Sequence, residues 1–84
     1  MDKVTAEKVV AEVEDRFSVY IDAGYPKPFL FEGSHEDLPD DAWVVSWEEG
    51  PDEWAYQFGL SEVPDVFTEP VYSWCLGVYP ADKY

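Results

Sequence analysis

The hydrophobic positions near the start of the chain repeat with the period of an α-helix. Apolar side chains recur at i, i+3, i+4 and i+7, which places them on one helix face: Ala6, Val9, Val10, Val13, Phe17, Tyr20 and Ile21. Thr5 is a suitable N-cap, Gly24 is suited to end the helix, and Pro26 prevents its continuation. The pattern therefore predicts a helix over about residues 5–23. Four acids lie off the apolar stripe and are expected to face solvent: Glu12, Glu14, Asp15 and Asp22.

A proline-containing connection over residues 24–41 separates this helix from the strands, and within it residues 29–32 are expected to form a short edge strand. The alternating patterns of residues 42–47 and 53–58 then predict a β-hairpin around a turn at residues 49–52. In that register Glu48 faces Glu53, and three apolar pairs share one face: Trp47 with Trp54, Val45 with Tyr56, and Trp43 with Phe58.

The C-terminal third is expected to hold a connection over residues 60–70, with a helical turn at residues 64–67, and a last strand over residues 71–79. Tyr72, Trp74, Leu76 and Val78 line the bulky face of that strand, which is expected to pack under the helix. Together the patterns predict a single compact acidic domain of the α+β class, residues 1–84. One N-terminal helix packs on a small antiparallel sheet of three to four strands, in the order α-β-β-β-β. Aromatic surface that the helix leaves uncovered, beside an acidic rim, would be typical of an interface.

Charge is the compositional feature that bears most on function. Nineteen acids against five bases give a formal net charge of −14, and no Lys or Arg occurs between Pro28 and Asp82, where thirteen acids lie. Direct binding to nucleic acid or to an anionic membrane is excluded by this charge, and a basic protein is the complementary partner.

The stretch WEEGPDEW, residues 47–54, concentrates this charge at the predicted turn. Like charges opposite each other in a hairpin are mildly destabilising, so the acids are not explained by folding. Two interpretations stay open: the turn is an exposed, solvated tip that keeps the edge soluble, or it is a contact surface for cations. In the second, the partner-binding residues are Glu36, Asp37, Asp40, Asp41, Glu48, Glu49, Asp52 and Glu53.

Catalytic, cofactor-binding and metal sites are not predicted. Cys75 is expected to be a buried, inert thiol and His35 a surface histidine beside carboxylates, and together they are too few for a cysteine-based zinc site. Nucleophile-elbow, calcium-loop and glycine-rich phosphate motifs do not occur. The single cysteine fits a reducing compartment, and the charges within residues 1–17 argue against a signal peptide. No segment has the length of a membrane span, so we expect a cytoplasmic protein that is not an enzyme.

The leading hypothesis is a non-enzymatic acidic protein-binding domain that occupies a basic surface of a partner. Its sharpest form is a nucleic-acid mimic or inhibitor, in which carboxylates imitate a phosphate track. Phage-encoded inhibitors and immunity proteins are of this general type. Two alternatives remain: a structural or assembly subunit that uses an aromatic face, and an immunity or antitoxin protein against a basic toxin. Electrostatic binding weakens as salt rises, whereas aromatic association barely responds.

Overall fold

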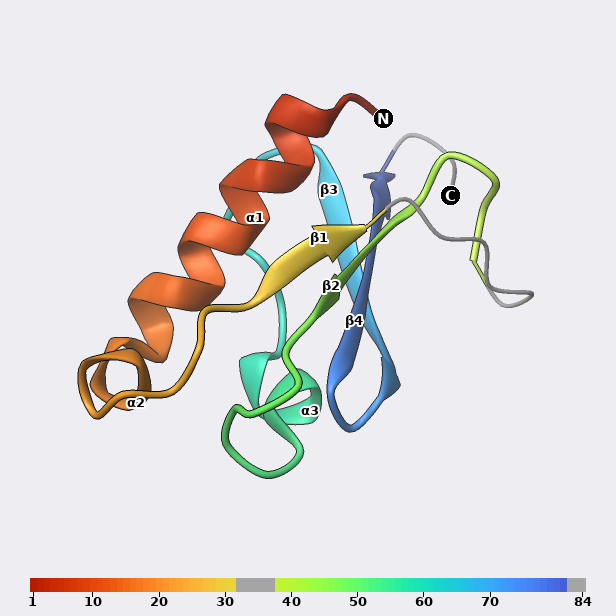
Figure 1. Ribbon diagram of the computed structural model, residues 1–84. Coiled ribbons are helices and arrows are strands. Elements are labelled where there is room, and N and C mark those ends of the chain that lie inside the picture. Colours follow the sequence, from red (N-terminus) through yellow and green to blue (C-terminus); the bar gives the residue numbers. More distant parts are fainter. Residues whose placement is uncertain (32–37, 82–84) are drawn as a thin grey trace.

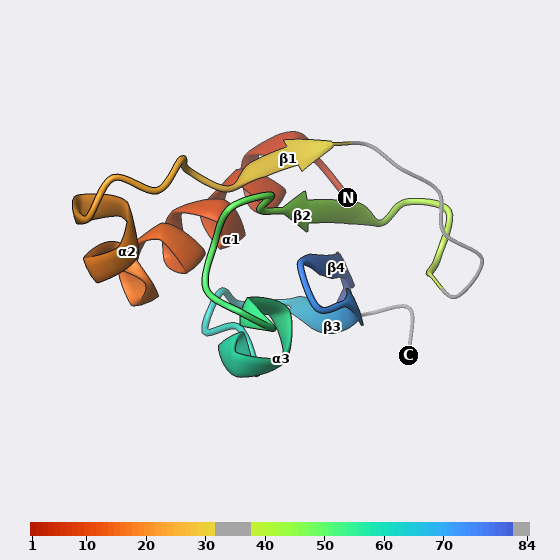
Figure 2. The same cartoon turned by 60° about the horizontal axis from the view of Figure 1, so that its bottom comes forward.

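A long N-terminal helix packs on one face of a four-stranded antiparallel sheet (Figures 1 and 2). The structure is a computed structural model, and it describes residues 1–31 and 38–81. Its elements are α1 (Lys3–Arg16), α2 (Ser18–Asp22), β1 (Phe29–Phe31), β2 (Trp43–Ser46), α3 (Trp54–Phe58), β3 (Val66–Tyr72) and β4 (Cys75–Pro80). The predicted α+β class, with its N-terminal helix and four antiparallel strands, is confirmed.

Helix α1 begins earlier than the sequence pattern predicted. Asp2, not Thr5, is its N-cap: the Thr5 N–H donates to Asp2 Oδ1 at 2.9 Å. Bonding by the Thr5 hydroxyl and by this N–H stabilises the carboxylate and lowers the pKa of Asp2. The helix breaks at Phe17, resumes as α2, and ends before Gly24, whose φ of 108° favours glycine.

The strands lie in the order β1-β2-β4-β3, so β1 is an edge strand, as expected for residues 29–31. Residues paired across strands share a face, and Leu30, Val45 and Leu76 are successive partners on the face toward α1. The main core lies there: Val9, Val13, Phe17, Val45, Trp47, Trp54, Ala55, Phe58, Val66, Leu76 and Val78. A smaller cluster covers part of the other face: Leu38, Ala42 and Val44.

The predicted hairpin over residues 42–58 is wrong. β2 pairs with β1 and β4, and residues 54–58 form helix α3. The apolar residues at 54, 56 and 58 resemble a strand, but 54 and 58 also lie on one face of a helical turn. Burial distinguishes the two, because Trp54, Ala55 and Phe58 are buried while Tyr56 is 57% exposed. The core can therefore accept these residues only as a helix.

The predicted last strand over residues 71–79 is confirmed only in part, because residues 75–79 lie in β4. Residues 71–72 instead end β3, Ser73 and Trp74 form the turn of a β3–β4 hairpin, and β3 begins at Val66, within the expected connection over residues 60–70. The helical turn predicted at residues 64–67 is wrong, because residues 64–65 form a turn and β3 begins at Val66. Strand β3 tolerates Pro70 because it is the edge strand next to β4, with a register shift between Pro70 and Tyr72. As a result Leu76 and Val78 are buried as predicted, but Tyr72 and Trp74, which were expected on the same face, are exposed.

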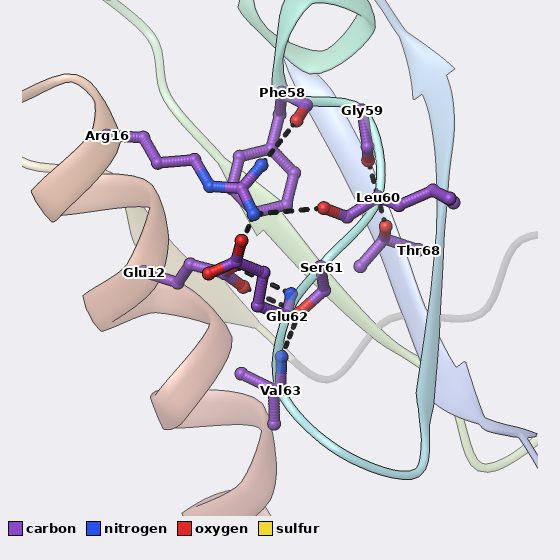
Figure 3. A network of polar contacts seen from close by, with 9 residues as sticks. All are labelled: Glu12, Arg16, Phe58, Gly59, Leu60, Ser61, Glu62, Val63 and Thr68. Atoms are coloured by element: carbon purple, nitrogen blue, oxygen red, sulfur yellow. Dashed lines mark hydrogen bonds and ion pairs between the residues drawn. The ribbon is translucent and has the colours of Figure 1, made fainter.

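Arg16 attaches α1 to the connection between α3 and β3 (Figure 3). Its guanidinium donates to the carbonyl oxygens of Phe58 at 2.7 Å and Leu60 at 3.0 Å, and lies 4.4 Å from the centroid of the Phe58 ring. It also pairs with Glu12 at 2.6 Å. The same carboxylate accepts from the Ser61 hydroxyl at 2.6 Å and the Glu62 N–H at 2.8 Å.

The expectation that Glu12 faces solvent is therefore wrong, because the connection packs over it. Asp15 and Asp22 are exposed as expected, and Glu14 is half-buried.

Candidate functional site

The loop of residues 48–53, which carries four acids, is flanked in the chain by two buried tryptophans. Trp47 and Trp54 are 1% and 0% exposed, and their ring centroids lie 5.9 Å apart in an edge-on contact. They are neighbours as predicted, but in the core between β2 and α3 rather than as a cross-strand pair. Trp47 Nε1 donates to the carbonyl oxygen of Pro26. This bond ties the Trp47 ring to the segment between α2 and β1.

Gly50 brings this loop directly onto the Trp47 ring. A Cβ at position 50 would lie 2.5 Å from Cδ2 of that ring, so the loop approaches more closely than any larger residue allows. Pro51 is buried beside it, whereas the four acidic residues of the loop are exposed: Glu48, Glu49, Asp52 and Glu53. Glu53 adopts a left-handed φ of 54° and immediately precedes α3. The loop packs its apolar residues inward and leaves its carboxylates in water.

The charge of this loop is not neutralised within the described part of the chain. In residues 1–31 and 38–81, no ion pair joins Glu48, Glu49, Asp52 or Glu53 to a cation. Residues 38–81 contain nine acids and no Lys or Arg. Partial neutralisation therefore has to come from solvent ions or from another molecule.

The β3–β4 turn lies beside the acidic loop, at the lower end of the molecule in Figure 1. The Trp47 N–H donates to the Trp74 carbonyl at 3.2 Å, and the Ala55 N–H donates to the Ser73 carbonyl at 3.1 Å. These two bonds join the turn to both ends of the 48–53 loop. The turn and both ends of the loop are therefore joined by backbone hydrogen bonds within the chain.

Two aromatic side chains of this turn are exposed. Tyr72 is 53% and Trp74 is 59% exposed, and their rings stack with centroids 6.5 Å apart and planes 25° apart. We call the six residues of the loop and turn the acidic–aromatic end: Glu48, Glu49, Asp52, Glu53, Tyr72 and Trp74. It combines uncompensated charge with large, exposed ring surface.

The remaining predicted acids are not part of this end. Asp40 and Asp41 lie before β2, whereas the acidic loop follows it, so the two groups occupy opposite ends of that strand (Figures 1 and 2). Asp40 is exposed, and Asp41 Oδ2 lies 3.5 Å from the Met1 amine. Glu36 and Asp37 are outside the described residues. Of the eight predicted partner-binding residues, the structure brings four together.

The sequence pattern did not identify Tyr72 and Trp74 as surface residues. Ser73-Trp74 lacks the Gly, Asn or Asp that marks a two-residue hairpin turn, so its sequence carries little turn signal. Their apolar character predicted a buried position instead. Exposed aromatic surface does occur at the β3–β4 turn, whose backbone is bonded to both ends of the acidic loop.

Other candidate chemistry is sparse in the described residues. Cys75 is half-buried rather than buried, and its Sγ lies 3.4 Å from Ser46 Oγ. His35 falls outside the described residues. Across residues 1–31 and 38–81 no cluster of three or more His, Cys, Asp or Glu could hold a metal ion. A hollow of about 590 Å³ beside the start of α1 is lined by residues of both charge signs, including Lys8 and Asp65.

Within the same described ranges, no helix is both long and apolar enough to cross a membrane. No protein-family model, curated protein or solved structure matches this chain. Functional inference therefore rests on the geometry and charge of the acidic–aromatic end.

Proposed function

We infer that the protein is a non-enzymatic binding domain that occupies a basic surface of a partner protein, with the acidic–aromatic end as its contact. The observation that carries this inference is that the loop with four uncompensated carboxylates is hydrogen-bonded at both ends to the turn that carries the exposed Tyr72 and Trp74. Tryptophan and tyrosine are the residues that most often dominate binding energy at protein interfaces. Charges around such anchors steer the encounter and select the partner.

The fixed backbone of this end favours binding. Gly50 of the loop packs on the Trp47 ring and the turn is bonded by the Trp47 and Ala55 N–H groups, so we expect little main-chain freedom to be lost on association. Ordering flexible segments at an interface costs free energy, and a preorganised surface reduces that cost.

A comparison of two charge-matched variants tests the proposal. The tip variant carries Glu48→Gln, Glu49→Gln, Asp52→Asn and Glu53→Gln. The matched variant makes the same four changes elsewhere: Glu7→Gln, Glu14→Gln, Asp15→Asn and Glu62→Gln. Both raise the net charge by the same amount, so a difference between them reports position and not total charge.

The tagged wild type and both variants are used to capture proteins from lysate at about 50 and 500 mM salt, where the screening lengths are roughly 14 and 4 Å. We expect a basic protein that the wild type and the matched variant retain at low salt, that high salt releases, and that the tip variant does not retain. Equal retention by the two variants would remove the acidic–aromatic end from the contact.

A nucleic-acid mimic or inhibitor is the sharper form of this function, and an immunity or antitoxin protein shares its physics. In the first case duplex DNA or RNA competes with the protein for the captured partner. In the second the partner is a basic toxin whose activity the protein suppresses. Competition and toxicity assays on the captured protein distinguish the two.

Assembly through an aromatic face is a second candidate, favoured by the sheet face opposite α1. By register Phe29 and Phe31 lie on that face with Val44 and Ser46, and Phe67 pairs with Tyr79 there. These three phenylalanines are exposed by 41–44%. Sedimentation equilibrium tests this function: association through the face persists at 500 mM salt and is lost in Phe29→Ser with Phe67→Ser.

A further inference from the structure

The exposed rings of the β3–β4 turn offer a flat surface of a particular chemistry. Tyr72 and Trp74 are each more than half exposed, and they are near-parallel, with planes 25° apart. An aromatic face is electron-rich, and indole attracts cations most strongly among the aromatic side chains. The turn therefore presents π surface to whatever approaches this end of the molecule.

The neighbouring loop decides the sign of the charge that this surface accepts. Glu48 follows Trp47, whose N–H is bonded to the Trp74 carbonyl, and Glu53 precedes α3, whose Ala55 N–H is bonded to the Ser73 carbonyl. Carboxylates thus enter and leave the loop beside the turn. An anionic or purely apolar partner would leave them unpaired, whereas a cationic side chain satisfies both the rings and the acids.

Among the cationic side chains, arginine fits this combination better than lysine. The guanidinium is planar and weakly hydrated, stacks on rings, and presents a fork of donors to carboxylates, whereas the ammonium of lysine is compact and strongly hydrated. The chain already holds one guanidinium in this way. Arg16 lies 4.4 Å above the Phe58 ring while its Nη2 is 2.6 Å from Glu12 (Figure 3).

We propose that the acidic–aromatic end binds arginine side chains of its partner in preference to lysine, with a guanidinium stacked on Trp74 and paired with the carboxylates of the 48–53 loop. This selectivity rests on the proposed function, because it names the residue type by which the basic partner is recognised.

Hexa-arginine and hexa-lysine peptides of equal charge, each carrying a fluorescent label, test the preference by anisotropy at about 50 mM salt. We expect the wild type to bind the arginine peptide roughly fivefold more tightly, the order of one solvent-exposed cation–π contact. Trp74→Phe keeps a ring and should keep the preference. Trp74→Leu keeps apolar bulk without a ring, so the two peptides should then bind within about twofold of each other.

Phe31→Leu removes a comparably exposed ring elsewhere, from edge strand β1, and should leave the preference intact. Because Trp74 contributes its carbonyl and not its side chain to the Trp47 bond, its variants keep the hydrogen bond that fixes the turn. Circular dichroism confirms that each variant is folded.

Indole N–H signals locate the contact directly. In a titration of ¹⁵N-labelled protein with the arginine peptide, the Trp74 signal should shift most, while those of the buried Trp47 and Trp54 should move little. A preference that survives in Trp74→Leu, or an unshifted Trp74 signal, would overturn the proposal.

The tip and matched variants separate this selectivity from the proposed function. Equal binding of both peptides, with a loss confined to the tip variant, refutes arginine selectivity and leaves the acidic contact standing. Equal losses in the tip and matched variants refute both, because the acidic–aromatic end would then hold no cation in particular.

Discussion

Phenylalanine substitutions at Trp47 and Trp54 should differ in cost even though both side chains are fully enclosed. Each change removes similar apolar volume from the same cluster, so the loss of burial and the cavity left behind are comparable. The indole N–H groups differ. That of Trp47 donates to the Pro26 carbonyl, whereas that of Trp54 has no hydrogen-bond partner within residues 1–31 and 38–81.

The difference follows from hydrogen-bond energetics. Trp47→Phe loses a bond with a net value of about 1 kcal/mol, because water can reach Pro26 at the surface. Trp54→Phe instead removes an unpaired buried donor, whose desolvation costs about 1–3 kcal/mol. We therefore expect Trp47→Phe to lower the free energy of unfolding by about 2–4 kcal/mol more than Trp54→Phe does. For a domain of this size each kcal/mol corresponds to about 4–8 °C in Tm.

Urea unfolding followed by far-ultraviolet circular dichroism measures this, because the signal does not depend on the tryptophans being replaced. Similar m-values in both variants would show that the midpoints report stability. Equal destabilisation, or a greater loss in Trp54→Phe, would refute the assignment of the two indole groups.

Three further predictions concern the side-chain contacts of helix α1 and the packing of the 48–53 loop. Arg16→Lys should destabilise the protein by about 1–2 kcal/mol in urea unfolding, because an ammonium cannot stack on Phe58 and reach all three oxygen partners; stability equal to that of wild type would contradict this. Gly50→Ala should cost about 1–3 kcal/mol, since its Cβ overlaps the Trp47 ring, and an unchanged Tm would show that the loop shifts freely. The lowered pKa of Asp2 means that its N-cap contributes fully above the unfolded-state pKa and is lost as pH falls through the folded-state value. Asp2→Ala should therefore be less stable than wild type near neutral pH and converge with it on acidification; a pH-independent difference would contradict that sign.

The helical part of the fold was predictable because its signal is long. Seven apolar positions at helical spacing outweigh any local ambiguity, and Gly24 and Pro26 mark the end. The cap was misplaced by three residues because Asp2 and Thr5 are both good N-caps.

The sheet was predictable in class but not in pairing. Residues 54–58 are too short for their period to decide between strand and helix, and what decides is the core that accepts Trp54 and Phe58. The turn at Ser73 and Trp74 lacks the residues that usually mark one, so tertiary pairing of β2 with β4 sets its position.

The candidate site was half predictable. The exposure of Glu48, Glu49, Asp52 and Glu53 follows from charge and from the Gly-Pro that places them in a loop. Tyr72 and Trp74 come from a turn that lies about twenty residues further along the chain, and no local sequence pattern joins the two segments. The Trp47–Trp74 bond that does so exists only once β2 and β4 have paired.

The salt dependence of affinity for a captured partner tests the acidic–aromatic end most directly. Titration calorimetry between about 50 and 500 mM salt compares wild type, the tip variant and the matched variant. At low salt we expect the tip variant to bind about tenfold or more weakly, with a flatter salt dependence, and the matched variant to stay within about twofold of wild type. Identical curves for the two variants would contradict the claim that this end is the contact surface.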